Sequence, residues 1–293
     1  MVRLKDPFDR PVSNLRVSLT SRCNLSCIYC HAEGEERPGD QLSCSEIAEI
    51  LRVADRFEIR HVKFTGGEPC LREDLAEIVS LVPDKMECSL TTNGTLLADM
   101  AGDLADAGLS RVNISIDSLN RETYTKIAGK DCLSDVLAGI EAALDAKLVP
   151  VKLNMVVLSG INDHEVDDFV RFVRGNRNLV LQLIELLGFR DCDHHYNLRD
   201  LETRFAKNAR EIFTRRMHHR RKYCVDNAEV EIVRPLHNTE FCAYCNRLRV
   251  TSDGKLKPCL LRSDNLVDIR GASGEKLEEL FREAVRRRAP YYR

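Results

Sequence analysis

Short β-rich runs alternate with longer segments of helical periodicity over the first two-thirds of this chain. The β-rich runs cover residues 15–19, 61–65, 87–91, 111–116, 150–158 and 179–186, and the helical segments cover 43–57, 73–81, 96–107, 134–146 and 163–174. No Gly/Ser-rich linker interrupts the series. Six such alternations predict one parallel α/β domain, either a barrel or an open sheet.

After about residue 190 the pattern changes. Residues 200–218 are expected to form a basic amphipathic helix, residues 222–250 a few short strands, and residues 274–288 a charged helix. Within this region the pair Asp253-Gly254 follows a strand-like run and is a strong hairpin signal. We therefore predict a first domain over residues 1–190 and a smaller C-terminal region over residues 191–293.

Composition narrows the class of protein. The 293 residues are 43% hydrophobic and 31% charged with a formal net charge of -2, which is typical of a globular protein and favours neither a nucleic-acid partner nor a membrane surface. No apolar run approaches the roughly 20 residues of a membrane span, and the first residues resemble no secretion signal. We expect a cytoplasmic protein. Its twelve cysteines are many for that compartment, where cysteines at short spacings more often bind metal.

The first group of closely spaced cysteines follows the first predicted strand. Cys23, Cys27 and Cys30 form a C-x3-C-x2-C pattern. Three thiolates on one tight loop can hold three corners of a cubane 4Fe–4S cluster and leave its fourth iron open. Zinc is the alternative, with His31 as a fourth ligand.

Polar motifs follow the next three strands. The sequence TGGEP (65–69) follows the second strand, TTNG (91–94) ends the third, and SIDS (115–118) ends the fourth. The carboxyl ends of parallel strands lie at one edge of a sheet, so these motifs and the cysteines are expected to meet there. Gly66 and Gly67 would let the backbone approach a ligand, and Glu68 offers a counter-charge to an ammonium.

The second group of cysteines is Cys242, Cys245 and Cys259, in a C-x2-C-x13-C pattern. The predicted hairpin would bring Cys259 back beside the other two. A zinc knuckle, with His237 as the nearest further ligand, and a second 4Fe–4S cluster with one open iron are both compatible with this pattern. The remaining cysteines show no ligand spacing, and most are expected to be small buried hydrophobes: Cys44, Cys70, Cys88, Cys132, Cys192 and Cys224.

The first cysteine pattern, with Tyr29 before its last cysteine and TGGEP one βα unit later, resembles the radical S-adenosylmethionine (SAM) superfamily. The resemblance implies that SAM binds the open iron and that an electron cleaves it to methionine and a 5′-deoxyadenosyl radical. It also implies that the SAM amino group lies at Gly66, Gly67 and Glu68. Ser115 would contact the SAM ribose or carboxylate, and Leu187 stands where the family often has a methionine near SAM.

The whole chain is similar to the GTP 3′,8-cyclase family of molybdenum cofactor biosynthesis. The similarity runs from about residue 10 to 270 through LRVSLTSRCNLSCIYC, TGGEP, TTNG, RVNISIDSL and CNRLRVTSDGKLKPC. It implies an incomplete (β/α)6 TIM-like barrel whose open side is closed by the C-terminal region. GTP would lie between two 4Fe–4S clusters, each on three cysteines, and become 3′,8-cyclo-7,8-dihydro-GTP. The implied partners are an electron donor, the downstream cyclic pyranopterin monophosphate synthase and a second copy of the chain.

Basic residues are the candidates for GTP binding. By resemblance the set is Arg16, which is also assigned to catalysis with the first three cysteines, together with Lys63, Thr91, Lys152, Arg247, Leu248 and Arg249. Arg16 and Lys63 lie on strands expected to be buried, where a cation needs an anionic partner. The alternatives are another two-cluster radical SAM enzyme, such as a peptide-modifying one, and a non-enzymatic iron–sulfur or zinc protein. The sequence departs from the family at its last residues. Many family members end in Gly-Gly, whereas this sequence ends in RRRAPYYR.

Overall fold

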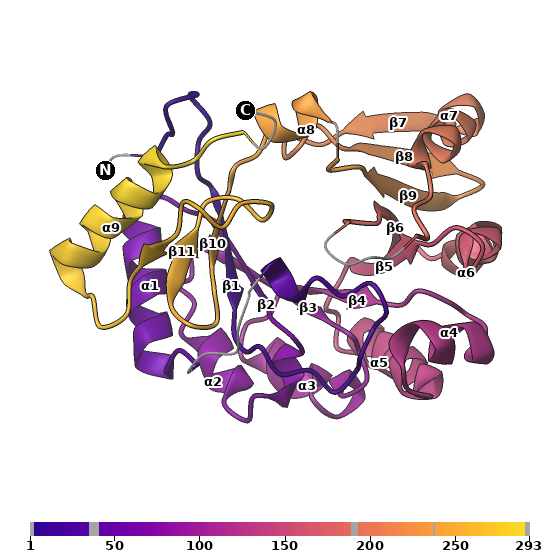
Figure 1. The fold of residues 1–293 in the computed structure, drawn as a ribbon. Coiled ribbons are helices and arrows are strands. Elements are labelled where there is room, and N and C mark those ends of the chain that lie inside the picture. The colour runs from indigo at the N-terminus through magenta and orange to yellow at the C-terminus, as the bar shows by residue number, and fades with distance from the viewer. Residues whose placement is uncertain (1–2, 35–40, 189–192, 237, 291–293) are drawn as a thin grey trace.

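The strands of this protein form one open, curved sheet. The computed structural model describes residues 3–34, 41–188, 193–236 and 238–290. The twelve described strands follow the order β12-β11-β10-β1-β2-β3-β4-β5-β6-β9-β8-β7 (Figure 1). Their bounds are β1 Asn14–Ser18, β2 His61–Thr65, β3 Glu87–Thr92, β4 Arg111–Ser115, β5 Val151–Val157, β6 Leu179–Glu185, β7 Glu211–Thr214, β8 Arg221–Val225, β9 Ala228–Val233, β10 Arg247–Val250, β11 Lys255–Lys257 and β12 Val267–Asp268.

The first six strands pair in parallel and in chain order, as the strand–helix alternation predicts. Strand β10 adds in parallel beside β1, and β9 adds in parallel beside β6. Antiparallel strands then extend both edges, so the sheet stays open and the expected incomplete barrel is confirmed. The C-terminal region thus adds strands to both edges of the sheet, and the division near residue 190 stays a prediction.

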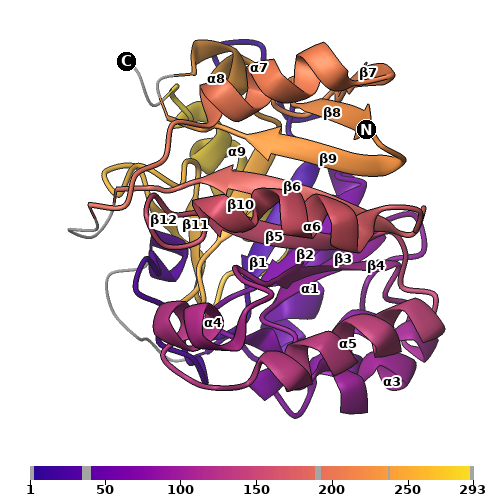
Figure 2. The same ribbon diagram turned by 90° about the vertical axis from the view of Figure 1, so that its right-hand side faces the viewer.

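Most of the helices cover the outer side of the curved sheet (Figures 1 and 2). Their bounds are α1 Cys44–Arg56, α2 Leu75–Ser80, α3 Ala101–Asp106, α4 Arg121–Ala128, α5 Leu133–Asp145, α6 Val166–Val173, α7 Leu198–Asn208, α8 Thr239–Ala243 and α9 Gly274–Arg286. Helix α9 packs against α1, with the rings of Phe57 and Phe281 6.1 Å apart. Among the described residues no helix is long and apolar enough to cross a membrane.

Alternation along the strands separates two chemically different faces. Apolar residues such as Val17 and Phe64 are fully buried in the core shared with the helices. The intervening positions, such as Arg16 and Lys63, face the concave side, because successive side chains of a strand point to opposite faces. A TIM barrel interior is normally filled by branched apolar side chains. The concave side here is polar instead, and we call it the lumen.

The helices on the outer side begin and end near the predicted residues. At α1 the Ser43 hydroxyl accepts a hydrogen bond from the Glu46 backbone N–H, and the Glu46 carboxylate accepts one from the Ser43 N–H, so the predicted capping box is confirmed. The short helix α4 was not predicted. The single helix predicted over residues 200–218 is wrong, because α7 ends at Asn208 and β7 then pairs with β8. The run Glu-Ile-Phe-Thr of β7 favours a strand, which the surrounding basic residues conceal.

Candidate functional site

The first cysteine loop leaves β1 and is held from two sides. The Gly67 and Glu68 N–H groups donate hydrogen bonds to the carbonyls of Thr20 and Arg22, both 2.7 Å long. On the other side, the Ser26 N–H donates to the Ala128 carbonyl at the end of α4, with a distance of 3.0 Å. The TGGEP turn and α4 are distant from each other in the sequence. Both therefore act on the same loop and fix the position of its three cysteines.

The two glycines of TGGEP are required by this close approach. Gly66 has φ +150°, and a Cβ on it would lie 3.1 Å from the Thr20 nitrogen and closer still to the Thr20 carbonyl oxygen. A Cβ on Gly67 would lie 2.6 Å from the Arg22 carbonyl carbon and 2.8 Å from the Ser21 oxygen. The approaching atoms belong to backbone, which cannot rotate away. The structure thus gives these glycines a role in the protein besides any contact with SAM.

Glu68 has a comparable role inside the protein. Its side chain is fully buried, and its carboxylate accepts hydrogen bonds from the Cys70 N–H, the Thr92 hydroxyl and the Asn93 N–H at 2.9, 2.6 and 2.6 Å. It thereby joins the turn after β2 to the end of β3. Burial raises the pKa of Glu68, although these hydrogen bonds oppose the shift. Its predicted contact with the SAM ammonium stays a prediction.

The three thiols of the first group lie close enough to influence one another. Burial raises the pKa of Cys27 first, and the charges of Asp117, Cys30 and Cys23 raise it further. The Asn93 side-chain amide donates to the Cys23 sulfur at 3.9 Å. Among the described residues, no three His, Cys, Asp or Glu side chains converge on one point as ligands of a single ion would. A cubane does not require that, because each cysteine binds a different iron, so this donor set fits a 4Fe–4S cluster.

Tyr29 and Asp117 form a buried pair beside the cysteine loop. The Tyr29 hydroxyl donates to the Asp117 carboxylate at 2.6 Å, and the Val156 N–H donates to its other oxygen at 2.8 Å. Asp117 belongs to SIDS, and the sequence analysis did not single it out. Burial raises its pKa from the ordinary value of 3.8 to about 6, despite these two hydrogen bonds.

The raised pKa of Asp117 predicts a pH-dependent stability. A carboxyl group whose pKa is higher in the folded chain destabilises the fold when it ionises, so a penalty accumulates between about pH 4 and 6. Asp117→Asn keeps a polar partner for Tyr29 and Val156 without the charge. We expect the variant to gain about 3 kcal/mol relative to the parent above pH 7, and less at pH 5. Denaturant unfolding of both anaerobic proteins at pH 5 and 7.5 measures this, and an equal difference at both values would contradict it.

The second cysteine group lies at the opposite end of the lumen. Cys245 comes just before β10, which runs parallel to β1, whereas Cys23 follows the end of β1. The hairpin of β10 and β11 is confirmed, with Arg249 paired to Lys257, so Cys259 returns toward Cys245. The motifs after the parallel strands and the second cysteine group therefore face each other along the lumen.

Buried cations hold the second cysteine loop. Arg10 donates to the Cys242 carbonyl at 2.9 Å and Arg288 to the Cys245 carbonyl at 2.6 Å, and both arginines pair with the buried carboxylate of Asp6. Burial alone would raise the pKa of Cys245, but Arg288, Arg249 and Arg247 outweigh it and lower the pKa. Such a thiol favours the thiolate form that binds iron. His237, the predicted alternative zinc ligand, lies outside the described residues.

Apart from Leu248, the predicted GTP residues lie on the lumen face of the strands, between the two cysteine groups. Arg249, Arg16 and Lys63 lie in register on β10, β1 and β2. Thr91 and Lys152 both lie in register with Asn113 of β4. The Lys63 ammonium donates to the Asn113 side chain at 2.9 Å, which links the two rows. The structure therefore brings together side chains that the sequence separates by more than 230 residues.

Sequence reasoning missed the carboxylates and two further arginines of the lumen. Glu33 pairs with Arg16 at 3.3 Å, and Glu231 pairs with Lys152 at 2.8 Å and with Arg215 and Arg220. Burial alone would raise the pKa of Glu33, but Arg16, His31 and Arg249 lower it to about 2. Neither glutamate belongs to a recognisable motif, so the sequence contained no signal for them.

The lumen holds more cations than carboxylates. Its cations include Arg16, Lys63, Lys152, Arg215, Arg220, Arg247 and Arg249, and in the described part of the chain the ion pairs of these seven involve only Glu33 and Glu231. Within the described residues, four buried donors also lack a hydrogen-bond partner there: Arg16 Nε, Arg249 Nε, Arg220 Nε and Thr91 Oγ1. A binding site for an anionic ligand requires an excess of positive charge and hydrogen-bond donors that have no partner in the protein.

Three predicted residues need separate comment. Leu248 is fully buried in the apolar core and lies in register with Leu15, so its side chain points away from the lumen. Its predicted contact with GTP stays a prediction, and from this position Leu248 could reach a ligand in the lumen only through its backbone. Ser115 ends β4, and Leu187 follows β6, both half-buried. Their contacts with SAM stay predictions.

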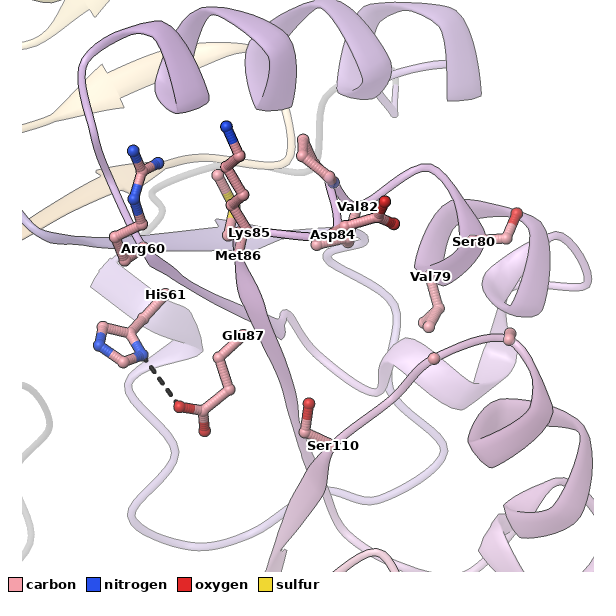
Figure 3. A pocket seen from close by; sticks show the side chains of 13 residues that line it. Arg60, His61, Val79, Ser80, Val82, Asp84, Lys85, Met86, Glu87 and Ser110 are labelled. Carbon is pink, nitrogen blue, oxygen red and sulfur yellow. Dashed lines mark ion pairs between the residues drawn. The ribbon is translucent and has the colours of Figure 1, made fainter.

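Of the six other cysteines, Cys70, Cys88 and Cys132 are buried, as expected, and Cys44 and Cys224 are half-buried. Cys192 lies outside the described residues. The best-defined surface cavity, about 570 Å³, lies elsewhere: it is formed by the N-terminal ends of β2 to β4 and their preceding loops (Figure 3). Its polar lining includes His61 and Glu87, which pair at 3.1 Å, and none of the predicted cluster, SAM or GTP residues. This cavity is not the candidate site.

Two family descriptions match the chain. Residues 17–173 match the Radical SAM superfamily, and residues 179–293 match Molybdenum Cofactor Synthesis C. Curated relatives named probable GTP 3′,8-cyclase include one from Methanocella arvoryzae, 49% identical over 99% of this chain and 95% of its own length. Those of Methanosarcina mazei and Archaeoglobus fulgidus are 50% and 45% identical over 99% of this chain, and over 90% and 99% of their own lengths.

Solved structures of similar fold include SuiB of Streptococcus suis bound to its precursor peptide SuiA. Its TM-score is 0.72 at 15% identity, and the match covers 92% of this chain and 64% of SuiB, less than two thirds of that protein. Native anSMEcpe with bound AdoMet gives a TM-score of 0.63 at 19% identity, covering 92% of this chain and 80% of that one. At such identities the similarity concerns the fold alone.

Proposed function

This chain belongs to the radical SAM superfamily and, within it, to the family of archaeal proteins named probable GTP 3′,8-cyclase, and on this premise we propose that it is itself a GTP 3′,8-cyclase. The reaction converts GTP to 3′,8-cyclo-7,8-dihydro-GTP and begins molybdenum cofactor biosynthesis. The single observation that favours it most is the cation-rich lumen between two cysteine groups.

We propose that Cys23, Cys27 and Cys30 hold one 4Fe–4S cluster and that SAM binds beside it, near Gly66, Gly67 and Ser115. When bound, this cluster and SAM supply the 5′-deoxyadenosyl radical that starts the reaction. The chain's own contribution is placement. Hydrogen bonds from TGGEP and α4 fix the cysteine loop, and Arg16 lies on β1, the strand that leads into this loop, where it pairs with Glu33.

The second cysteine group is proposed to hold a second 4Fe–4S cluster on Cys242, Cys245 and Cys259, against which the guanine docks. The lowered pKa of Cys245 supports this, because it favours the thiolate ligand. The triphosphate would extend along Arg16, Lys63, Lys152, Arg247 and Arg249, with Thr91 as a further polar contact. Arginine suits bidentate phosphate contacts, and lysine supplies a compact charge.

Partners and compartment follow from this function. A low-potential electron donor must reduce the first cluster, and the cyclic pyranopterin monophosphate synthase would consume the product. We propose the cytoplasm as the compartment and a homodimer as the assembly.

Product analysis tests the assignment. The reconstituted, reduced protein is incubated anaerobically with SAM and GTP, and the expected products are 5′-deoxyadenosine and the cyclised nucleotide in equal amounts. If deoxyadenosine forms and GTP survives, the substrate assignment fails and a peptide-modifying activity gains support. Iron analysis tests the clusters separately, since about eight iron atoms per chain are expected. Zinc in their place after anaerobic purification would contradict the radical mechanism.

Arg249→Ala should weaken GTP handling without abolishing SAM cleavage. The Arg249 guanidinium is buried in the lumen with an unpartnered Nε, so a phosphate contact there is charge-assisted. A lost bond of this kind corresponds to roughly a 10- to 100-fold rise in KM for GTP. Steady-state kinetics measures it, with Arg52→Ala on the outer helix α1 as the control. An unchanged KM would remove Arg249 from the site.

A further inference from the structure

We propose that Glu231 is a positioning residue that holds Lys152, Arg215 and Arg220 as one wall of the phosphate site, and that Arg220 itself contacts the phosphates. This inference rests on the proposed function. It adds a carboxylate and two arginines, all from the C-terminal region, to the lysine that the family resemblance already assigns.

Glu231 is the most completely buried carboxylate of the lumen. It lies on the inner face of β9, in register with Gln182 of β6, and its side chain has no exposed surface. Lys152 donates to Oε1 at 2.8 Å and Gln182 to Oε2 at 2.8 Å. Arg215 pairs with Oε1 as well. A buried carboxylate with this many donors is stabilised as the anion, and its pKa is about 2 even though burial would raise it.

Arg220 differs from the other partners of Glu231 because its donors remain open. Its ion pair with Glu231 spans 3.7 Å, which is too long for a hydrogen bond. Its side chain is only 14% exposed, its Nε is buried, and it makes no side-chain hydrogen bond within the described parts of the chain. A buried guanidinium with open donors is costly unless a ligand completes it.

The segment that bears the two arginines is anchored beside the second cysteine group. It connects β7 to β8, and the buried ring of His218 stacks on Phe241 with centroids 3.8 Å apart. The His218 N–H also donates to the Tyr244 carbonyl at 3.0 Å. Phe241 and Tyr244 flank Cys242. This anchoring holds the largely buried Arg220 at the lumen, together with the partly exposed Arg215.

Charge arithmetic favours a polyphosphate as the ligand. The seven cations named above exceed the two carboxylates that pair with them by five, and the buried Lys257, in register with Arg249 on the same face, adds a further positive charge. A nucleoside triphosphate carries roughly four negative charges near neutral pH, up to two of them on the terminal phosphate. Lys63 and Arg247 are also buried among other positive charges, which an anionic ligand in the lumen would compensate.

A series of guanine nucleotides tests the contact of Arg220. Binding of GTP, GDP, GMP and guanosine to the SAM-loaded enzyme is measured by anaerobic calorimetry for the parent, Arg220→Ala and Arg220→Lys. We expect Arg220→Ala to weaken GTP binding by about 10- to 100-fold and guanosine binding by less than about twofold, with partial recovery in Arg220→Lys. The neighbouring Arg221 is exposed, and Arg221→Ala serves as the control.

The role of Glu231 is tested by a pH profile. Burial lowers the pKa of Lys152 to about 8, and the charge of Glu231 opposes this shift while Arg215 and Arg220 add to it; Lys63 lies across the lumen. In Glu231→Gln the opposing charge is gone, so Lys152 loses its proton at lower pH. The rise of KM for GTP at alkaline pH should therefore begin at lower pH than in the parent, while Glu231→Asp restores the parent profile in part.

Two results would overturn the inference. Equal weakening of all four ligands in Arg220→Ala would mean a structural effect, and an unshifted profile in Glu231→Gln would remove the positioning role. Both variants are compared with a parent enzyme that has been shown to cyclise GTP. If the parent enzyme does not cyclise GTP, the proposed function is wrong, and this outcome is distinct from a failure of the inference about Glu231 and Arg220.

Discussion

Cys23→Ala is expected to abolish 5′-deoxyadenosine formation. Two remaining thiolates on the loop cannot hold a cubane with a single open iron, so SAM loses both its anchor and its electron source. The change removes only an exposed sulfur, which accepts hydrogen bonds from the Asn93 side chain, at 3.9 Å, and from the Leu25 backbone N–H. The fold should therefore survive. Deoxyadenosine is quantified after anaerobic incubation with SAM and reductant, and iron should fall from about eight to about four atoms per chain.

The matched control for Cys23 is Cys88→Ala. Cys88 is buried on β3, on the face that packs against the helices. Its loss should lower stability by roughly 1 kcal/mol without changing iron content or SAM cleavage. Deoxyadenosine formation at the parent rate in Cys23→Ala would refute the assignment of the first cluster.

Gly67→Ala is expected to displace the first cysteine loop. The added Cβ would lie 2.6 Å from the Arg22 carbonyl carbon and nearer still to its oxygen, and both atoms belong to the backbone that leads directly into Cys23. Relieving this overlap requires breaking the hydrogen bonds to Thr20 and Arg22. We expect a loss of roughly 1–3 kcal/mol in the free energy of unfolding and poor reconstitution of one cluster. Denaturant unfolding and iron analysis measure the two effects.

Gly102→Ala is the control for the glycine substitution. Gly102 lies within α3, and a Cβ there would meet no atom within 4 Å. Alanine in an exposed helix should stabilise the chain by about 0.5–1 kcal/mol. If Gly67→Ala behaves like Gly102→Ala, the TGGEP turn does not position the cysteine loop through these contacts.

The strands were predictable because each combines a buried apolar face with turn residues at its ends. The predicted run 61–65 coincides with β2, the runs for β3, β4 and β6 differ from the strands by one residue at one end, and those for β1 and β5 differ by one residue at each end. Helix α4 and strand β7 escaped prediction because both are short. Helix α4 spans only eight residues, and β7 spans only four, which are all exposed and lie among basic residues.

The candidate site was predictable where residues act within a short segment. Two motifs are of this kind: the three cysteines Cys23, Cys27 and Cys30, and the TGGEP turn. In each motif the functional residues lie within a few positions of one another. The predicted ligands of the two clusters therefore could be named from the sequence. Asp117, Glu33 and Glu231 could not, because a single carboxylate has no pattern, and its role depends on partners in other elements, from 17 to 88 positions away.

The sequence by itself determined the class of chemistry, because cysteine spacing and a glycine turn are local features that survive any arrangement of the rest. Only the tertiary structure decided that the two cysteine groups lie at opposite ends of one lumen, since this depends on the direction in which β10 joins β1. It also decided which cations share that lumen and which carboxylates hold them. Strand order and register set these distances, and both arise from pairing between segments that are remote in the chain.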